Sequence, residues 1–274
     1  MATIPSATQL GASLSSDRHI ALLIDADNVS HAKIAAILAE TARYGTANIR
    51  RAYGDWSAAA LKGWKGKLHE YAVRPIQQFS YSTGKNATDI AMVIDALELL
   101  YTQNLDAFCI ASSDGDFTPL VMHLRAAGKA VYGFGMAKTP EAFVNACTTF
   151  LFLERLGESS EPLEVTATQS AAEPTKAAIQ PPAKAEKTLA QDAKLVTILR
   201  GALEASAGDD GWAPLSAAGS AAKRLASIDP RNYGVATFTR LYEATGLFDV
   251  QRGASGQPYV ADRRNKERSA KPGG

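Results

Sequence analysis

The sequence predicts an α/β fold, a mostly parallel sheet with helices on both faces, followed by a small C-terminal winged-helix domain. Two observations support this prediction. Over residues 17–156, short apolar runs alternate with amphipathic stretches, the pattern of parallel strands joined by crossover helices. Over residues 189–263, three helical stretches precede two strand-like stretches that Gly253 and Gly256 separate, which is the order of elements in a winged helix.

The strands expected in the first domain are short and apolar, as strands buried on both faces usually are. They are expected at residues 19–24, 48–53, 72–77, 106–111, 130–134 and 149–153. Asn28 or Ser30 can cap the first helix, and later helices are expected at residues 57–71, 88–101 and 117–127. In the helix over 88–101, the residues expected to face the core are Ile90, Val93, Ile94, Leu97 and Leu100.

The second domain is expected to contain three helices and a hairpin, at residues 189–205, 214–225, 235–245, 247–252 and 257–261. The segment 157–188 between the domains is punctuated by prolines and contains no aromatic residue. Such a segment cannot bury enough apolar surface to offset its ordering entropy, so we expect a flexible linker. Residues 1–16 are expected to be disordered, and residues 264–274 to form a basic disordered tail.

The composition excludes several classes of protein. The formal net charge of +1 over 274 residues excludes a wholly basic polymer binder, although it permits local basic patches. The 2 cysteines cannot form a disulfide framework or a four-cysteine zinc site. No apolar run reaches the roughly 20 residues of a membrane helix, and the first 18 residues lack the pattern of a secretory signal. We therefore expect a soluble, cytoplasmic protein with no membrane partner.

Acidic residues follow the ends of two predicted strands and lie at the start of one predicted helix. Asp25 ends the first strand, Asp114 and Asp116 follow the strand over 106–111, and Asp89 lies at the start of the long helix. Ligands of open parallel sheets bind beyond the carboxyl ends of the strands, so these four side chains are expected to converge. Four like charges at close range repel, and hard divalent cations such as Mg²⁺ or Mn²⁺ relieve that repulsion. The set predicts a catalytic metal site for phosphodiester hydrolysis.

Other interpretations stay open for single residues. An Asp after a strand is often only a helix cap or turn residue. Asp95 lies about 240° around the helix from Asp89, so we expect it behind the site or in a structural role. Asp25 and Asp27 could also be the nucleophile and acid of a haloacid-type phosphatase, although Asn28 and Val29 do not suit that pattern.

The order of three motifs, IDADN, KNATDIAMVIDALEL and ASSDGDFTPLVMHLRAAGKAVYGFG, resembles the NYN branch of the PIN-like nuclease superfamily in its LabA-like form. The resemblance covers about residues 18–155 and implies a metal-dependent ribonuclease fold. It implies that Asp25, Asp89, Asp114 and Asp116 bind the metal. It also implies that Asn28 and Ser112 are polar neighbours that orient a substrate or a ligand carboxylate, with Asp27 beside them.

Basic and aromatic side chains alternate between the second strand and the acidic helix. Lys and Arg follow phosphates and aromatic rings stack on unpaired bases, so this stretch predicts binding of single-stranded RNA. The residues expected to contact RNA are Arg51, Lys62, Lys65, Lys67, Tyr81 and Lys85. Trp56, Trp64 and Tyr71 could instead belong to the core.

The stretch IDPRNYGVATFTRLYEATGLFDVQ resembles the LOTUS (OST-HTH) domain, over about residues 190–262. The resemblance implies an RNA-targeting module, in which Arg231, Tyr233 and Arg240 are candidate contacts. The leading hypothesis is a metal-dependent endoribonuclease of single-stranded RNA whose tethered second domain adds affinity. A homodimer or RNA-processing proteins are further possible partners. The alternative is a non-catalytic RNA-binding or regulatory protein that keeps the acidic pocket.

Overall fold

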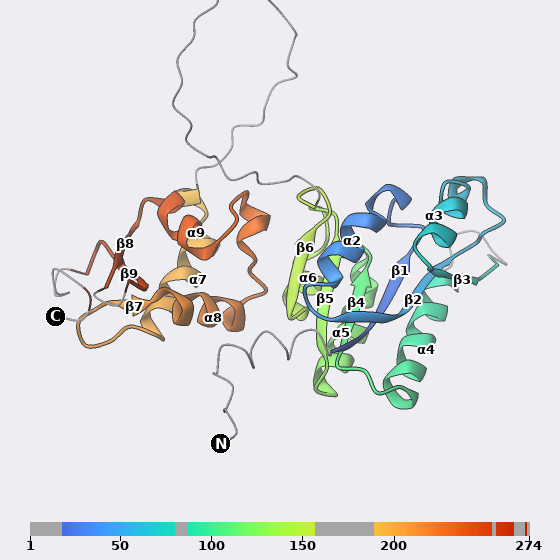
Figure 1. Ribbon diagram of the computed structural model, residues 1–274, viewed down its shortest axis with the longest axis horizontal. Helices are drawn as coiled ribbons and strands as arrows, with labels where there is room; N and C mark the ends of the chain where they lie inside the picture. Colours follow the sequence, from blue (N-terminus) through green and yellow to red (C-terminus); the bar gives the residue numbers. More distant parts are fainter. Residues whose placement is uncertain (1–17, 80–86, 157–188, 254–255, 266–271, 273–274) are drawn as a thin grey trace, which may run out of the picture. The chain divides into compact units, whose positions relative to one another are not determined.

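The computed structural model describes residues 18–79, 87–156, 189–253, 256–265 and 272 (Figure 1). The chain divides into two compact units. The first comprises residues 1–157 together with Ala226–Asn232, and the second comprises residues 158–225 and 233–274. None of the described helices is both long and apolar enough to cross a membrane.

A six-stranded sheet, parallel throughout, forms the centre of the first unit, with strand order β3-β2-β1-β4-β5-β6. The strands are β1 (His19–Asp25), β2 (Thr46–Gly54), β3 (Arg74–Gln77), β4 (Ala107–Ala111), β5 (Ala130–Gly135) and β6 (Thr149–Phe152). The predicted parallel α/β class is confirmed. The buried character of β1 and β4 explains why apolar runs located them so well.

Helices cover both faces of this sheet (Figure 1). They are α2 (Ile34–Thr41), α3 (Trp64–Glu70), α4 (Ala87–Thr102), α5 (Thr118–Ala126) and α6 (Glu141–Ala146), with the short 3₁₀ helices η1 (His31–Lys33), η2 (Ala59–Leu61) and η3 (Gly115–Phe117). One core packs α2 and α3 against Ile20, Leu22 and Ile24 of β1. The other packs α4, α5 and α6 against Ala21 and Leu23, so successive residues of β1 enter opposite cores.

One prediction for the helices is wrong, and another is only partly right. The expected helix over 57–71 is two separate helices, η2 and α3, with Lys62 and Gly63 between them. In α4, the buried side chains are Thr88, Met92, Ala96, Leu99 and Leu100, whereas Ile90 and Ile94 are 59% and 60% exposed. Of the five predicted core residues, Leu100 is buried and Val93 and Leu97 pack against the core, so the prediction is wrong only for Ile90 and Ile94.

The second unit contains the helices and hairpin of a winged helix. Its elements are η4 (Leu189–Gln191), α7 (Ala193–Glu204), β7 (Ala213–Pro214), α8 (Leu215–Leu225), α9 (Phe238–Thr245), β8 (Phe248–Arg252) and β9 (Pro258–Asp262), and η5 (Pro230–Tyr233) lies across the division between the units. The predicted hairpin is confirmed, and β7 adds a third antiparallel strand in the order β7-β9-β8. Thr237 caps α9 through its side chain, so this helix begins later than predicted.

Candidate active site

Asp25, Asp89, Asp114 and Asp116 form what we call the acidic site, and Asp25 is its buried member. It is the last residue of β1, and only 1% of its surface is exposed. Its carboxylate accepts hydrogen bonds from Ser112 Oγ and Asn28 Nδ2, both at 2.7 Å, and from the backbone N–H groups of Asp27 and Asn28, both at 3.2 Å. Burial raises the pKa of Asp25, and the bonds from Ser112 and Asn28 oppose that rise. The side chain is therefore held in one orientation.

Ser112 connects Asp25 to the second acidic segment. It follows β4 directly, and its Oγ accepts the backbone N–H of Asp114 at 3.0 Å while donating to Asp25. Asp114 Oδ1 in turn accepts the backbone N–H of Asp116 at 2.9 Å and caps η3. Both Asp114 and Asp116 are thus positioned by a turn that starts at the strand end.

Asp89 lies in the first turn of α4 and is partly buried. Burial, followed by the charges of other carboxylates, raises its pKa from 3.8 to about 6. Those carboxylates belong to Asp25, Asp114, Asp116 and Asp27, in decreasing order of effect. Three segments that are distant in the sequence therefore place their negative charges within electrostatic reach of one another.

The loop after β4 also depends on Gly135, which the sequence analysis did not single out. A Cβ atom on Gly135 would lie 2.6 Å from the backbone oxygen of Ser112, so only glycine permits this approach. Just beyond it, the backbone N–H of Met136 donates to Ser113 Oγ at 2.8 Å. A glycine at the end of an apolar strand was the available signal.

Asp95 lies six residues beyond Asp89 on α4 and binds two side chains of β2. It accepts hydrogen bonds from Arg51 and from the hydroxyl of Tyr53, which pairs in register with Asp25. Asp95 therefore links α4 to β2, the strand beside β1. The Arg51 side chain is only 22% exposed, and its guanidinium is engaged by Asp95, which makes Arg51 a weaker candidate for contact with RNA.

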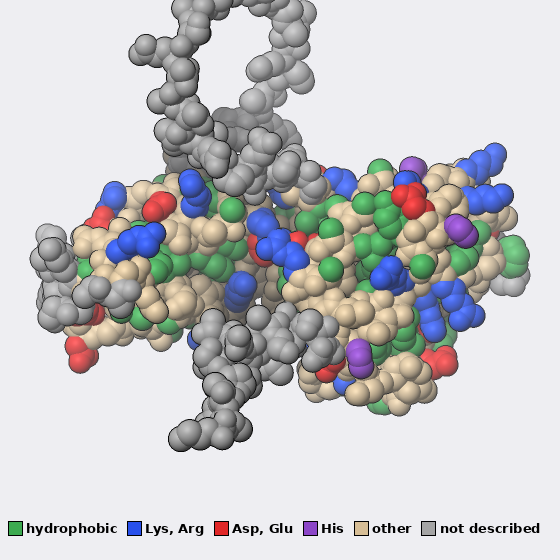
Figure 2. Space-filling view, viewed as in Figure 1, with side chains coloured by type: hydrophobic (Ala, Val, Ile, Leu, Met, Phe, Trp, Pro, Cys, Tyr) green, Lys and Arg blue, Asp and Glu red, His purple; other side chains and the backbone are tan. Residues whose placement is uncertain are grey.

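The predicted basic residues of the first unit fall into two groups. On the face shown in Figure 2, basic side chains gather over the part of this unit that α3 and β3 build. Lys62 and Lys65 are exposed and line a groove there, together with Trp56. Lys67 pairs with Glu70 at 2.8 Å on the exposed side of α3. Trp64 belongs to the core.

The predictions for Tyr81 and Lys85 lie outside the described residues. Arg231, Tyr233 and Arg240 are the contacts predicted for the LOTUS domain; Arg231, in the segment Ala226–Asn232, is bound to Asp229 by an ion pair of 2.8 Å, which engages its guanidinium. Tyr233 is half-buried, and burial raises its pKa to about 12. Arg240 is exposed on α9, so it is the candidate among these three with the most accessible charge.

The donor set fits a hard divalent cation. All of its members are carboxylates, and their mutual repulsion is what such a cation relieves. Within the described part of the chain, no three His, Cys, Asp or Glu side chains are gathered tightly enough to hold a metal ion as they stand. Mg²⁺ commonly uses one or two protein carboxylates and completes its coordination with water and substrate phosphate.

Comparison with known proteins gives two further similarities. An uncharacterized protein, MJ0482, of Methanocaldococcus jannaschii is 29% identical over 126 residues, which is 43% of this chain and 48% of that protein. The chain thus spans about half the length of this relative. A crystal structure of VPA0982 from Vibrio parahaemolyticus, a protein of unknown function, matches 50% of this chain and 93% of its own with 17% identity and a TM-score of 0.42.

Family models match both parts of the chain. The NYN domain model matches residues 19–154, which contain the acidic site and the parallel sheet. The OST-HTH/LOTUS domain model matches residues 186–260, which contain the winged helix. The NYN domain belongs to the PIN-like nuclease superfamily, and the two domains together support a nuclease and RNA-binding role. The chain therefore joins an NYN domain of the PIN-like nuclease superfamily to a C-terminal OST-HTH/LOTUS domain.

Proposed function

We propose that this protein is a metal-dependent endoribonuclease that cleaves single-stranded RNA, with the LOTUS domain supplying additional RNA affinity. The observation that carries the proposal is the convergence of carboxylates from two other segments on Asp89, where burial and then the charges of Asp25, Asp114, Asp116 and Asp27 raise its pKa. Carboxylates that repel one another destabilise the folded protein, and a bound cation would offset this repulsion. We propose Asp25, Asp89, Asp114 and Asp116 as the residues that hold Mg²⁺ or Mn²⁺.

The chemistry that such an ion supplies is activation of a water molecule and stabilisation of charge on the leaving oxygen of the phosphodiester. Asp25 anchors the site, because Ser112 and Asn28 fix both of its carboxylate oxygens. Asp89 must lose its proton before it can bind a cation, so cation affinity should fall as the pH drops through about 6. Asp114 and Asp116 complete the acidic set from the turn after β4.

A cleavage assay tests this function directly. Single- and double-stranded RNA and DNA are incubated with the full chain in Mg²⁺, Mn²⁺ or EDTA, and internal fragments of labelled strands are measured. We expect cleavage of single-stranded RNA in the metal arms only, and its loss in Asp25→Asn with RNA affinity largely retained. Asp209→Asn, an exposed aspartate of the second unit, serves as the matched control.

Three outcomes would contradict the proposal: equal cleavage by Asp25→Asn and the wild type, cleavage that persists in EDTA, and no cleavage in any arm. The last of these, if RNA binding is retained, would favour the alternative of a non-catalytic RNA-binding protein.

A further inference from the structure

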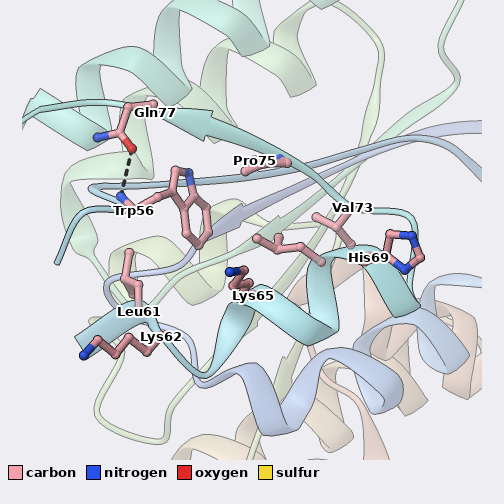
Figure 3. A pocket seen from close by; sticks show the side chains of 9 residues that line it. Trp56, Leu61, Lys62, Lys65, His69, Val73, Pro75 and Gln77 are labelled. Atoms are coloured by element: carbon pink, nitrogen blue, oxygen red, sulfur yellow. Dashed lines mark hydrogen bonds between the residues drawn. The ribbon is translucent and has the colours of Figure 1, made fainter. Parts of the chain in front are cut away.

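A groove with a volume of about 980 Å³ lies on the first unit, between α3 and the edge strand β3 (Figure 3). Its apolar lining includes the side chains of Trp56, Leu68, Val73 and Pro75. This groove is separate from the acidic residues, none of which lines it. Its volume is in the range of small-molecule sites, which are usually mostly apolar with a few polar groups.

Trp56 is held in place before any ligand binds. Its indole Nε1 donates to the backbone oxygen of Ile76 at 2.9 Å, and its backbone N–H donates to Gln77 Oε1 at 3.0 Å. The ring also packs edge-on against the buried ring of Trp64, with centroids 6.4 Å apart. Figure 3 shows the indole turned into the groove. A ring that is already ordered loses little further entropy when a flat ligand stacks on it.

The ionisable residues that line the groove are all basic. Lys62, Lys65 and His69 line it, and no Asp or Glu does. Within the described residues, neither Lys62 nor Lys65 forms an ion pair. An ordered aromatic ring beside unpaired ammonium groups complements a flat base joined to phosphates.

The groove begins at the same edge of the sheet as the acidic site. Tyr53 pairs in register with Asp25, and the next residue of β2, Gly54, pairs with Gln77 of β3. Two strand spacings, about 10 Å, therefore separate the mouth of the groove from the β1 end. An extended polymer can occupy both.

We propose that this groove binds an unpaired base of the RNA chain, which stacks on Trp56 while Lys62 and Lys65 contact the flanking phosphates. The proposal takes its ligand class, RNA, from the proposed function. It adds that the groove is a binding site for single-stranded RNA. Double-stranded RNA keeps its bases stacked within the helix, so the groove would also select against it.

The experiment measures RNA affinity by fluorescence anisotropy, with the full chain in EDTA so that no cleavage can occur. Two labelled strands are compared: a single-stranded oligoribonucleotide and an abasic strand of equal length and charge. We expect Trp56→Ala to weaken binding of the normal strand about 5- to 100-fold. The same change should alter binding of the abasic strand less than twofold. Trp56→Phe, which keeps a ring, should recover most of the affinity.

Matched controls separate the groove from general effects. Tyr101→Ala removes an exposed aromatic ring from the far end of α4, and Arg43→Gln removes a positive charge beyond α2. Lys65→Gln should weaken binding of both strands and reduce the slope of log Kd against log salt concentration by about one. Arg43→Gln should do neither. Melting temperatures verify that each variant is folded.

Equal losses on the normal and abasic strands, or wild-type affinity in Trp56→Ala, would overturn the proposal. The second result would favour a protein partner as the occupant of the groove. Because binding is read without metal, absence of cleavage in the separate assay would leave this result standing. Conversely, if the protein cleaves RNA but Trp56→Ala binds RNA as the wild type does, the proposal for the groove is wrong and the proposed nuclease function stands.

Discussion

At the scale of single residues, the acidic site combines one anchored carboxylate with others that are less constrained. Asp25 is buried and receives bonds from Ser112 and Asn28, whereas Asp116 is exposed. Asp89 lies between these extremes, and burial, followed by the charges of the neighbouring carboxylates, raises its pKa to about 6. A cation-binding site with this character should cost stability when the cation is absent.

Asp89→Asn should stabilise the metal-free protein at pH 8. The folded-state pKa of Asp89 is raised, so its ionised form destabilises the native state above about pH 6, and the cost disappears below the unfolded value near 4. The full shift corresponds to about 3 kcal/mol, and screening at a partly exposed site reduces the expected gain to about 1 kcal/mol. Denaturant unfolding in EDTA at pH 8 and pH 4 measures it. A gain that is equal at both pH values, or a loss at pH 8, would contradict this account.

At the scale of elements, the position of α4 decides where Asp89 lies. The Asp95 carboxylate binds Arg51 and Tyr53, so this helix is held to β2 by a partly buried polar contact as well as by its apolar face. Removing one partner of such a network leaves the others without a bond and costs far more than the network contributes.

Asp95→Ala should therefore lower the free energy of unfolding by about 2 to 4 kcal/mol. Glu98→Ala, an exposed acidic change one turn away on the same helix, should stay within about 0.5 kcal/mol of the wild type. Urea unfolding of the two variants at pH 7 gives the comparison. Similar values for both would show that the contact of Asp95 with β2 contributes little.

The sequence predicted the strands better than the helices, for physical reasons. Residues 19–24 were expected as a strand and β1 spans His19–Asp25, because a strand buried on both faces is continuously apolar. The buried face of α4 was predicted only in part: Leu100, Val93 and Leu97 pack into the core, whereas Ile90 and Ile94 are exposed. The periodicity of large aliphatic residues predicts one face of the helix. The face that is actually buried depends on how the helix packs against the sheet.

The acidic residues of the site were predictable from their positions at strand and helix ends. Asp25 and Asp114 follow from the rule that ligands bind at the carboxyl edge of a parallel sheet. The contact between Asp95 and Arg51 was not predictable, because it joins residues of β2 and α4 that no local pattern relates. Arg51 was predicted to contact RNA because it lies near aromatic residues in the sequence.

At the scale of the whole molecule, two domains with different roles share one chain. The NYN domain holds the acidic site, and the LOTUS domain presents Arg240 on α9. A domain that binds RNA raises the effective concentration of RNA for the other domain of the same chain. Affinity and chemistry should therefore respond to different substitutions.

Arg240→Gln should weaken RNA binding about two- to fivefold at low salt and reduce the salt dependence of Kd by about one ion. The cleavage rate at saturating RNA should not change, because Arg240 lies in the second unit and contributes no ligand to the acidic site. Arg43→Gln again controls for loss of a positive charge. Single-turnover kinetics over a range of RNA concentrations separates the two effects, and a lower maximal rate in Arg240→Gln would refute this division.

Titration of the full chain with Mn²⁺ by calorimetry at pH 6 and pH 8 is the most direct measurement of whether the clustered carboxylates form a cation site. We predict saturable binding that releases more protons at pH 6 than at pH 8, because Asp89 is about half protonated at the lower pH. Asp89→Asn should weaken the binding and remove most of that difference, while Asp209→Asn should leave both unchanged. Absence of saturable binding, or identical titrations for Asp89→Asn and the wild type, would contradict the account.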